Sequence, residues 1–265
     1  MYLSKQWHES RIISVLAILA LALLFLLVTR GNFAMSSTHG DFHVTQGNQD
    51  NPGGFAMAFI PLFYFEAVLV AFWGWLAAGI GAGKNLGDES GSFLFTRPRR
   101  RAWFLWNDWG YAMTQIALIV ALSNIMIGSL LSRILIVLHS PGSIQLTPNS
   151  APIPLFIMML LMSVGVLLFA GLIYGITYLC TILIQRSAGV MLGAGVLVAY
   201  EVLRGLMHHY FPFIHLPDLI LGLFNFSHHT FNGLSDHLGI AIAARAVFIL
   251  LLPLAAQVIL ERSEI

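Results

Sequence analysis

Two carboxylates lie inside stretches of this chain that are otherwise apolar, Glu66 and Glu201. A charged side chain is costly in hydrocarbon, so such residues face protein or water and commonly mark an ion or substrate path. Arg204 follows Glu201 by three positions, which places both side chains on one helical face and predicts an ion pair. Glu66 has no partner nearby in the sequence. Glu66, Glu201, Arg204 and Asn124, a polar residue in a third apolar run, are candidates for a substrate path. For Glu201 a structural ion pair with Arg204 is the preferred interpretation, and for Glu66 a buried structural carboxyl group is an equal alternative.

The composition indicates that these residues belong to a membrane protein. Apolar residues make up 58% of the 265 residues, charged residues 9%, and the mean hydropathy is +0.82. Soluble domains are about one quarter charged, so this chain is an integral membrane protein. Its single cysteine, Cys180, excludes an internal disulfide framework. No Gly-rich Lys-Ser/Thr loop of the Walker type is present, so any ATP that drives this protein is hydrolysed by another chain.

The apolar runs predict an all-α fold with six transmembrane helices in one domain that covers residues 1–265. Each run is close to the length of about 20 residues that crosses a bilayer. The spans are expected at about 12–29, 55–82, 111–138, 153–184, 188–207 and 239–260. Residues 208–238 are broken by Pro212 and Pro217, which predicts a short helix that is partly inserted into the outer leaflet between spans five and six.

The distribution of Lys and Arg predicts the orientation. With both termini in the cytoplasm, the inner segments hold nine of the thirteen Lys and Arg residues and the outer parts hold four. Short cytoplasmic loops are enriched in Lys and Arg, so both termini and the loop between spans two and three are expected inside. Nine of the ten histidines then lie outside. Clustered histidines can bind transition metals, but no Cys or dense carboxylate set accompanies them, so solvated or interfacial histidines are the preferred interpretation.

The loop between spans two and three has an unusual pattern, within Gly83 to Trp109. An acidic turn with Asp88 and Glu89 precedes the apolar triplet 93–95, and Pro98 and an arginine cluster follow. A helix that begins near residue 86 should end before Pro98, because the residue before a proline is pushed out of the α region. We predict an amphipathic helix at the membrane surface. A cytoplasmic loop that only fixes orientation would not require the apolar triplet.

This order of acidic pair, glycine, apolar triplet, Thr-Arg-Pro and basic cluster resembles the first cytoplasmic loop of type-two ATP-binding-cassette exporter permeases. In that family the loop forms a coupling helix, which docks into a groove on a separate ATPase subunit. The resemblance covers about residues 84 to 110, and the six-span layout extends it along the chain. The sequence departs from the family pattern at Asn107-Asp108, where the family often carries a Lys.

The resemblance implies that this chain is the membrane-spanning permease subunit of an ABC exporter in the bacterial inner (plasma) membrane. It implies no catalytic residue, metal or cofactor on this chain, with ATP and Mg on a partner ATPase subunit, and a homodimer or pseudo-dimer of permeases. The residues expected to couple to the ATPase are Asp88, Glu89, Phe93, Leu94, Arg97, Arg99, Arg100 and Arg101. Nothing in the sequence identifies the transported substrate.

Two other functions remain as alternatives. Intramembrane metalloproteases of the CAAX-processing type carry a Glu-Glu-x-x-x-Arg element and two later His elements. Here Glu201-Val-Leu-Arg204 lacks the second Glu, and the other two matches share His228. A metal-activated water needs about three protein ligands, which this arrangement does not supply. The other alternative is a non-transporting membrane scaffold.

Two further features of the loop have an ordinary interpretation. The tryptophans that bracket it, Trp73, Trp75, Trp103, Trp106 and Trp109, are expected to anchor the chain at the membrane interface. The arginine cluster could contact nucleic acid or acidic lipid. Inner-leaflet headgroups are the nearest phosphates, so we expect membrane lipid and no nucleic acid as a partner.

Overall fold

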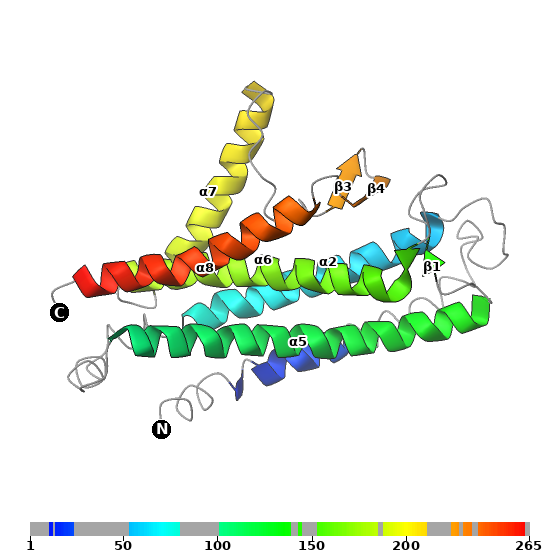
Figure 1. Ribbon diagram of the computed structural model, residues 1–265, viewed down its shortest axis with the longest axis horizontal. Coiled ribbons are helices and arrows are strands. Elements are labelled where there is room, and N and C mark those ends of the chain that lie inside the picture. Colours follow the sequence, from blue (N-terminus) through cyan, green and yellow to red (C-terminus); the bar gives the residue numbers. More distant parts are fainter. Residues whose placement is uncertain are drawn as a thin grey trace.

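In the computed structural model the chain forms a bundle of long helices (Figure 1). The structure describes residues 11–12, 14–23, 53–79, 101–138, 143–144, 153–184, 188–210, 224–227, 230–234 and 238–262. The long helices in these ranges are α2 (Gly53–Ala78), α5 (Arg101–Leu138), α6 (Leu155–Ile184), α7 (Gly189–Tyr210) and α8 (Leu238–Arg262).

Four of the described helices are long and apolar enough to cross a membrane. The crossing segments are Ala102–Ser129 in α5, Met159–Ile184 in α6, Gly189–Met207 in α7 and Ile242–Arg262 in α8. A helix rises 1.5 Å per residue, so about 20 residues span the hydrocarbon core. The chain is therefore an α-helical membrane protein. At the first two expected spans the described residues contain shorter apolar helices, Ser14–Leu23 and Glu66–Ala78, so the number six stays a prediction.

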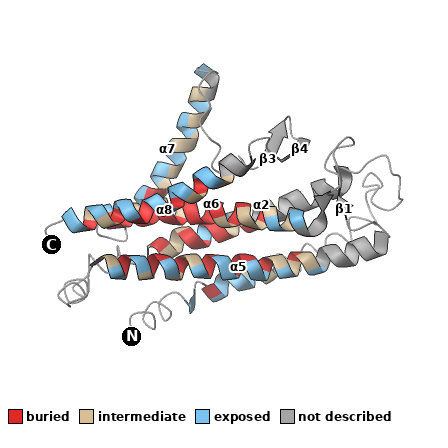
Figure 2. Cartoon of the chain, viewed as in Figure 1, coloured by how far each residue is buried: buried red, intermediate tan, exposed pale blue. Residues whose placement is uncertain are grey.

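Helix α6 lies at the centre of the bundle. It packs against α2, α5, α7 and α8, and the buried residues concentrate along it and on the helices beside it (Figure 2). Its sequence explains this place, because α6 contains no charged residue. A helix that is apolar all round can be covered by other helices on every side.

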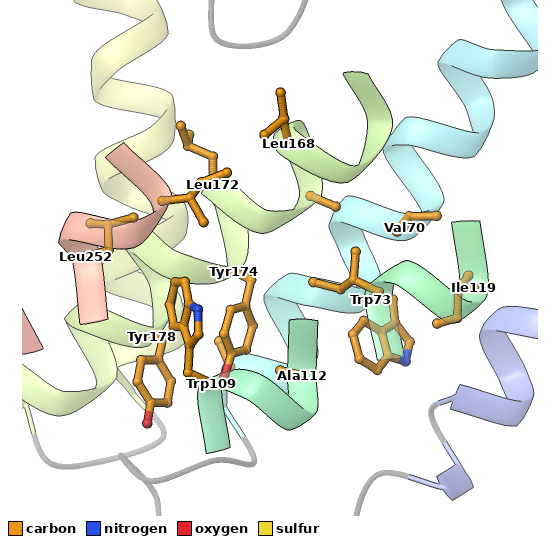
Figure 3. Close-up of a cluster of buried hydrophobic side chains, with 14 of the residues drawn as sticks. Val70, Trp73, Trp109, Ala112, Ile119, Leu168, Leu172, Tyr174, Tyr178 and Leu252 are labelled. Atoms are coloured by element: carbon orange, nitrogen blue, oxygen red, sulfur yellow. The ribbon is translucent and has the colours of Figure 1, made fainter. Parts of the chain in front are cut away.

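The core joins side chains from α2, α5, α6 and α8 (Figure 3). It includes Val70, Trp73, Trp109, Ala112, Ile119, Leu168, Leu172, Tyr174, Tyr178 and Leu252. Trp73 and Trp109 are among its buried members. The predicted role of these two tryptophans as interface anchors is therefore wrong, because protein rather than lipid headgroups surrounds them.

Helices α6 and α7 approach closely where α7 begins. A Cβ atom added at Gly193 would lie 2.8 Å from the Cα of Thr177, and one added at Gly189 would collide with the backbone of Thr181. Small residues four positions apart commonly allow two membrane helices to pack backbone to backbone. Beyond this contact α7 diverges from the other helices (Figure 1), and most of its residues from Gly195 to Leu206 are exposed.

The other described elements are two short antiparallel ladders. β1 (Ser143–Ile144) pairs with β2 (Ile153–Pro154), and β3 (Phe224–Ser227) pairs with β4 (Thr230–Leu234). The partly inserted helix that we expected between spans five and six falls mainly on residues 211–223, which lie outside the described residues, and the described residues that follow form the β3–β4 ladder. Phe224 to Ser227 alternate apolar and polar side chains, which is the period of a strand and not of a helix.

Helix α5 begins at Arg101, well before residue 111, where the third span was expected to begin. No proline or glycine occurs between Arg101 and Trp109 to interrupt a helix. The Asn107 side chain also donates a hydrogen bond to the Trp103 carbonyl at 2.7 Å, one turn earlier. The Asn107-Asp108 pair, where the sequence departs from the family pattern, therefore lies within the first turns of a continuous helix.

Candidate functional site

The candidate coupling segment connects α2 to α5. Seven of its predicted coupling residues lie outside the described residues, namely Asp88, Glu89, Phe93, Leu94, Arg97, Arg99 and Arg100. The eighth, Arg101, is the first residue of α5. The structure therefore describes the two helices that flank the segment, and not the predicted amphipathic helix itself.

Both flanking helices meet the rest of the bundle at one end. Helices α2, α6 and α8 finish there, at Ala78, Ile184 and Arg262, and α5 and α7 begin there, at Arg101 and Gly189 (Figure 1). We call this the linker end, because the candidate coupling segment leaves α2 and enters α5 at this end.

The end of α2 is bound to α6 and α7. The Trp75 indole N–H donates a hydrogen bond to the Val190 carbonyl of α7 at 3.0 Å. The Thr181 hydroxyl of α6 lies 3.5 Å from the Ala78 carbonyl and 2.7 Å from that of Tyr178. A Cβ atom added at Gly79 would lie 2.5 Å from the side chain of Val190. The last turn of α2 therefore cannot move without shifting the start of α7.

The beginning of α5 is bound to the end of α8. The Trp106 indole N–H donates a hydrogen bond to Gln257 Oε1 at 3.0 Å. The Gln257 amide in turn donates to Glu261 Oε1 at 2.9 Å, one turn further along α8. Sequence analysis gave Trp75 and Trp106 no role beyond interface anchoring. The signal available was the indole N–H itself, which usually finds a partner when its ring is partly buried.

An aromatic cluster connects α5 to α6 just inside the linker end (Figure 3). The rings of Trp109 and Tyr174 have centroids 5.2 Å apart, and those of Trp109 and Tyr178 are 5.9 Å apart. Tyr174 and Tyr178 stack on each other at 5.4 Å. Gly175 leaves room for this cluster, because a Cβ atom there would lie 2.8 Å from the Trp109 ring and 2.5 Å from Leu252.

Of the four candidate path residues, Glu66 and Asn124 lie toward the middle of the bundle. Glu66 of α2 is buried, and neither carboxyl oxygen has a hydrogen-bond partner among the described residues. Ser123 of α5, which is buried too, lies beside the carboxyl group but does not complete a hydrogen bond with it in the described structure. Asn124 donates from its amide to the Val120 carbonyl at 2.7 Å, while its Oδ1 is buried without a partner in the described structure.

The other two candidates form the predicted ion pair. Arg204 Nε donates to Glu201 Oε2 at 2.9 Å within α7, and both side chains are 32% exposed. The pair lies beyond the contact of α7 with α6, on the part of α7 that diverges from the bundle. The ion pair on α7 is therefore separate from Glu66 of α2 and from Asn124 of α5.

Within the described part of the chain, no group of three or more His, Cys, Asp or Glu residues could hold a metal ion. His228, on which the metalloprotease alternative depends, lies outside the described residues.

Comparisons of the chain with protein-family models, with curated proteins and with solved structures found no match.

Proposed function

We propose that this chain is the permease subunit of an ATP-driven exporter and that a separate ATPase subunit hydrolyses the ATP. The observation that best supports this proposal is the construction of the linker end. The polar, arginine-rich segment between α2 and α5 joins two helices that are hydrogen-bonded to α7 and α8 at that same end. A displacement of the segment would act on the whole bundle.

The proposed coupling uses the two parts of the segment differently. Phe93 and Leu94 fill a groove on the ATPase, because a few buried apolar anchors usually supply most of the energy of an interface. The acidic pair Asp88 and Glu89 and the arginines that follow make charge contacts around that groove. Closure of the ATPase subunits on ATP then pushes the segment and tilts α2 and α5.

The proposed transporter contains two copies of the permease, and α7 supports this part of the proposal. Its crossing segment is far less buried than those of α5, α6 and α8. The partly exposed ion pair of Glu201 and Arg204 lies on this helix, and charged groups inside a membrane normally face protein or water rather than lipid. A second copy that packs along α7 would cover the pair, and the substrate path would lie between the copies.

An affinity purification tests the proposal. The tagged chain is extracted from its native membrane in mild detergent and compared with the double variant Phe93→Asp, Leu94→Asp. We expect an ATPase subunit to co-purify with the natural chain and to be lost from the variant, because two charges would be placed in an apolar groove. The double variant Phe33→Asp, Phe42→Asp is the matched control, since the same change is made in the loop expected on the other side of the membrane.

The membrane fraction reports whether each variant is inserted at the natural level. Loss of the ATPase from the Phe93, Leu94 variant alone would support the proposal. Recovery of no ATPase with the natural chain, or equal recovery with both variants, would contradict it.

A further inference from the structure

The carboxyl group of Glu66 is isolated in the contact between α2 and α5. The residue is 1% exposed, and no described residue makes a well-formed hydrogen bond with either oxygen. The position of Glu66 along the bundle can be given relative to a known contact. Gly74 of α2 lies beside Ile116 of α5 and Ala170 of α6. Glu66 lies about two turns from that contact, away from the linker end.

Among the described residues, no charged side chain of the elements packed around α2 balances this carboxyl group. The described stretch 14–23, α5 between Trp109 and Leu131, and the whole of α6 contain no Asp, Glu, Lys, Arg or His. The charges of α7 nearest to mid-span are Glu201 and Arg204, which pair with each other. Arg245 of α8 is buried and has an interaction of its own. An ionised carboxylate in such a place would cost several kcal/mol, so the group requires a cation of some kind.

We propose that Glu66 is a proton-binding site, which the contact between α2 and α5 closes around a neutral carboxylic acid. The neighbouring oxygen groups favour a proton over a metal ion. Ser123 of α5 adds one hydroxyl oxygen beside the carboxyl group, whereas hard metal cations such as Ca²⁺ and Mg²⁺ take about six or more oxygen ligands. A proton needs only the carboxyl group itself, and the acid O–H can then donate to the Ser123 hydroxyl.

The site gives the protein a proton-linked conformational change, and this step depends on the proposed function. The helices α2 and α5 flank the candidate coupling segment, so a push on that segment would separate them. Water would then reach Glu66, the O–H bond of the acid would break, and the proton would pass to water and leave a carboxylate. Closure of the contact reverses the transfer.

Infrared spectroscopy of the purified chain in lipid tests the site directly. A protonated carboxyl group has a carbonyl stretching band that a carboxylate lacks. We expect such a band at neutral pH, complete loss of it in Glu66→Gln, and no loss in Glu201→Gln. The second variant is the matched control, because Glu201 is another described carboxyl in a membrane-crossing helix and is paired with Arg204. In Ser123→Ala the band should remain but shift in frequency, because its hydrogen bond is removed.

Every outcome of this experiment either supports or contradicts the proposal. A band that depends on Glu66 and is unaffected by added NaCl supports a proton site. If the band disappears when NaCl is added, a monovalent metal ion and not a proton is the cation that the site binds. If the natural chain and Glu66→Gln give the same spectrum, Glu66 is ionised. Either result would contradict the proposal. The measurement needs no ATPase, so it can succeed even if the exporter proposal fails. Loss of the band during ATP turnover in the assembled complex tests the release step separately.

Discussion

Trp109 shows how a residue can differ in role from its neighbours of the same type. It is the last of five tryptophans around the coupling segment, yet it is 5% exposed and packs between Tyr174, Tyr178 and Gly175. Trp103, two turns earlier on α5, is 38% exposed. One ring therefore stabilises the bundle, while the other lies on its surface.

We predict that Trp109→Ala lowers the stability of the chain in detergent by about 3–5 kcal/mol, because a large buried aromatic side chain is removed and a cavity remains. The loss is measured as a decrease in the thermal unfolding midpoint of the purified chain. Trp103→Ala is the matched control and should change the stability by less than about 1 kcal/mol. Equal effects of the two substitutions would contradict the assignment of Trp109 to the core.

At the scale of elements, the contact between α6 and α7 depends on the glycines at the start of α7. Gly193 lies directly against the Cα and side chain of Thr177, whereas a Cβ atom at Gly195 would meet nothing within 4 Å. Two glycines only two positions apart on one helix therefore differ in function. One permits the close approach of α6, and the other faces away from it.

We expect Gly193→Ala to destabilise the α6–α7 contact by about 1–3 kcal/mol, because the new methyl group overpacks a tight interface. Gly195→Ala should be neutral or stabilising by up to about 1 kcal/mol, since alanine is the better helix former. Thermal unfolding of the two variants in the same detergent measures the difference. A Gly195 variant that is at least as unstable as the Gly193 variant would contradict the assignment of the close helix contact to Gly193.

At the scale of the whole molecule, α7 is the element that this single chain leaves incomplete. Its first turns are packed against α6 and α2, but its later residues carry a partly exposed ion pair and exposed apolar side chains. A helix at the edge of a monomer would present an apolar surface to lipid. Two charged groups on that surface would be unfavourable in contact with lipid. They therefore favour a second copy of the chain as the neighbour of α7.

Cysteine cross-linking in native membranes tests this arrangement. The natural Cys180 is buried and is first replaced by alanine. Val198→Cys on α7 is then expected to form a disulfide-linked dimer on mild oxidation, because symmetric copies bring equivalent positions of an interface helix together. The product is seen as a band of doubled mass on a non-reducing gel.

Ile125→Cys on α5 provides the control for this experiment. The two positions are similarly exposed, at 64% for Val198 and 69% for Ile125, so random collision in the membrane would cross-link both. If the Ile125 variant forms dimers and the Val198 variant does not, the interface lies at α5 and the predicted interface along α7 is wrong.

Much of the architecture could be predicted from the sequence, because a membrane imposes a strict rule. Backbone groups in hydrocarbon must be hydrogen-bonded within a helix, so long apolar runs become helices wherever they occur. The described helices α6, α7 and α8 therefore begin within two residues of the predicted spans. The Glu201–Arg204 ion pair could also be predicted from the sequence, since it depends only on the spacing within one helix.

The residues that could not be predicted are those whose surroundings come from distant parts of the chain. The burial of Trp109 depends on Tyr174 and Tyr178, and the pairing of β3 with β4 depends on two strands that the hydropathy pattern did not predict. The sequence by itself determined the class of protein and the position of most helices, because hydropathy and local spacing act within one segment. The tertiary structure alone decided that α6 is central, that α7 diverges and that Glu66 has no charged neighbour among the described residues, because each of these depends on the packing of separate helices.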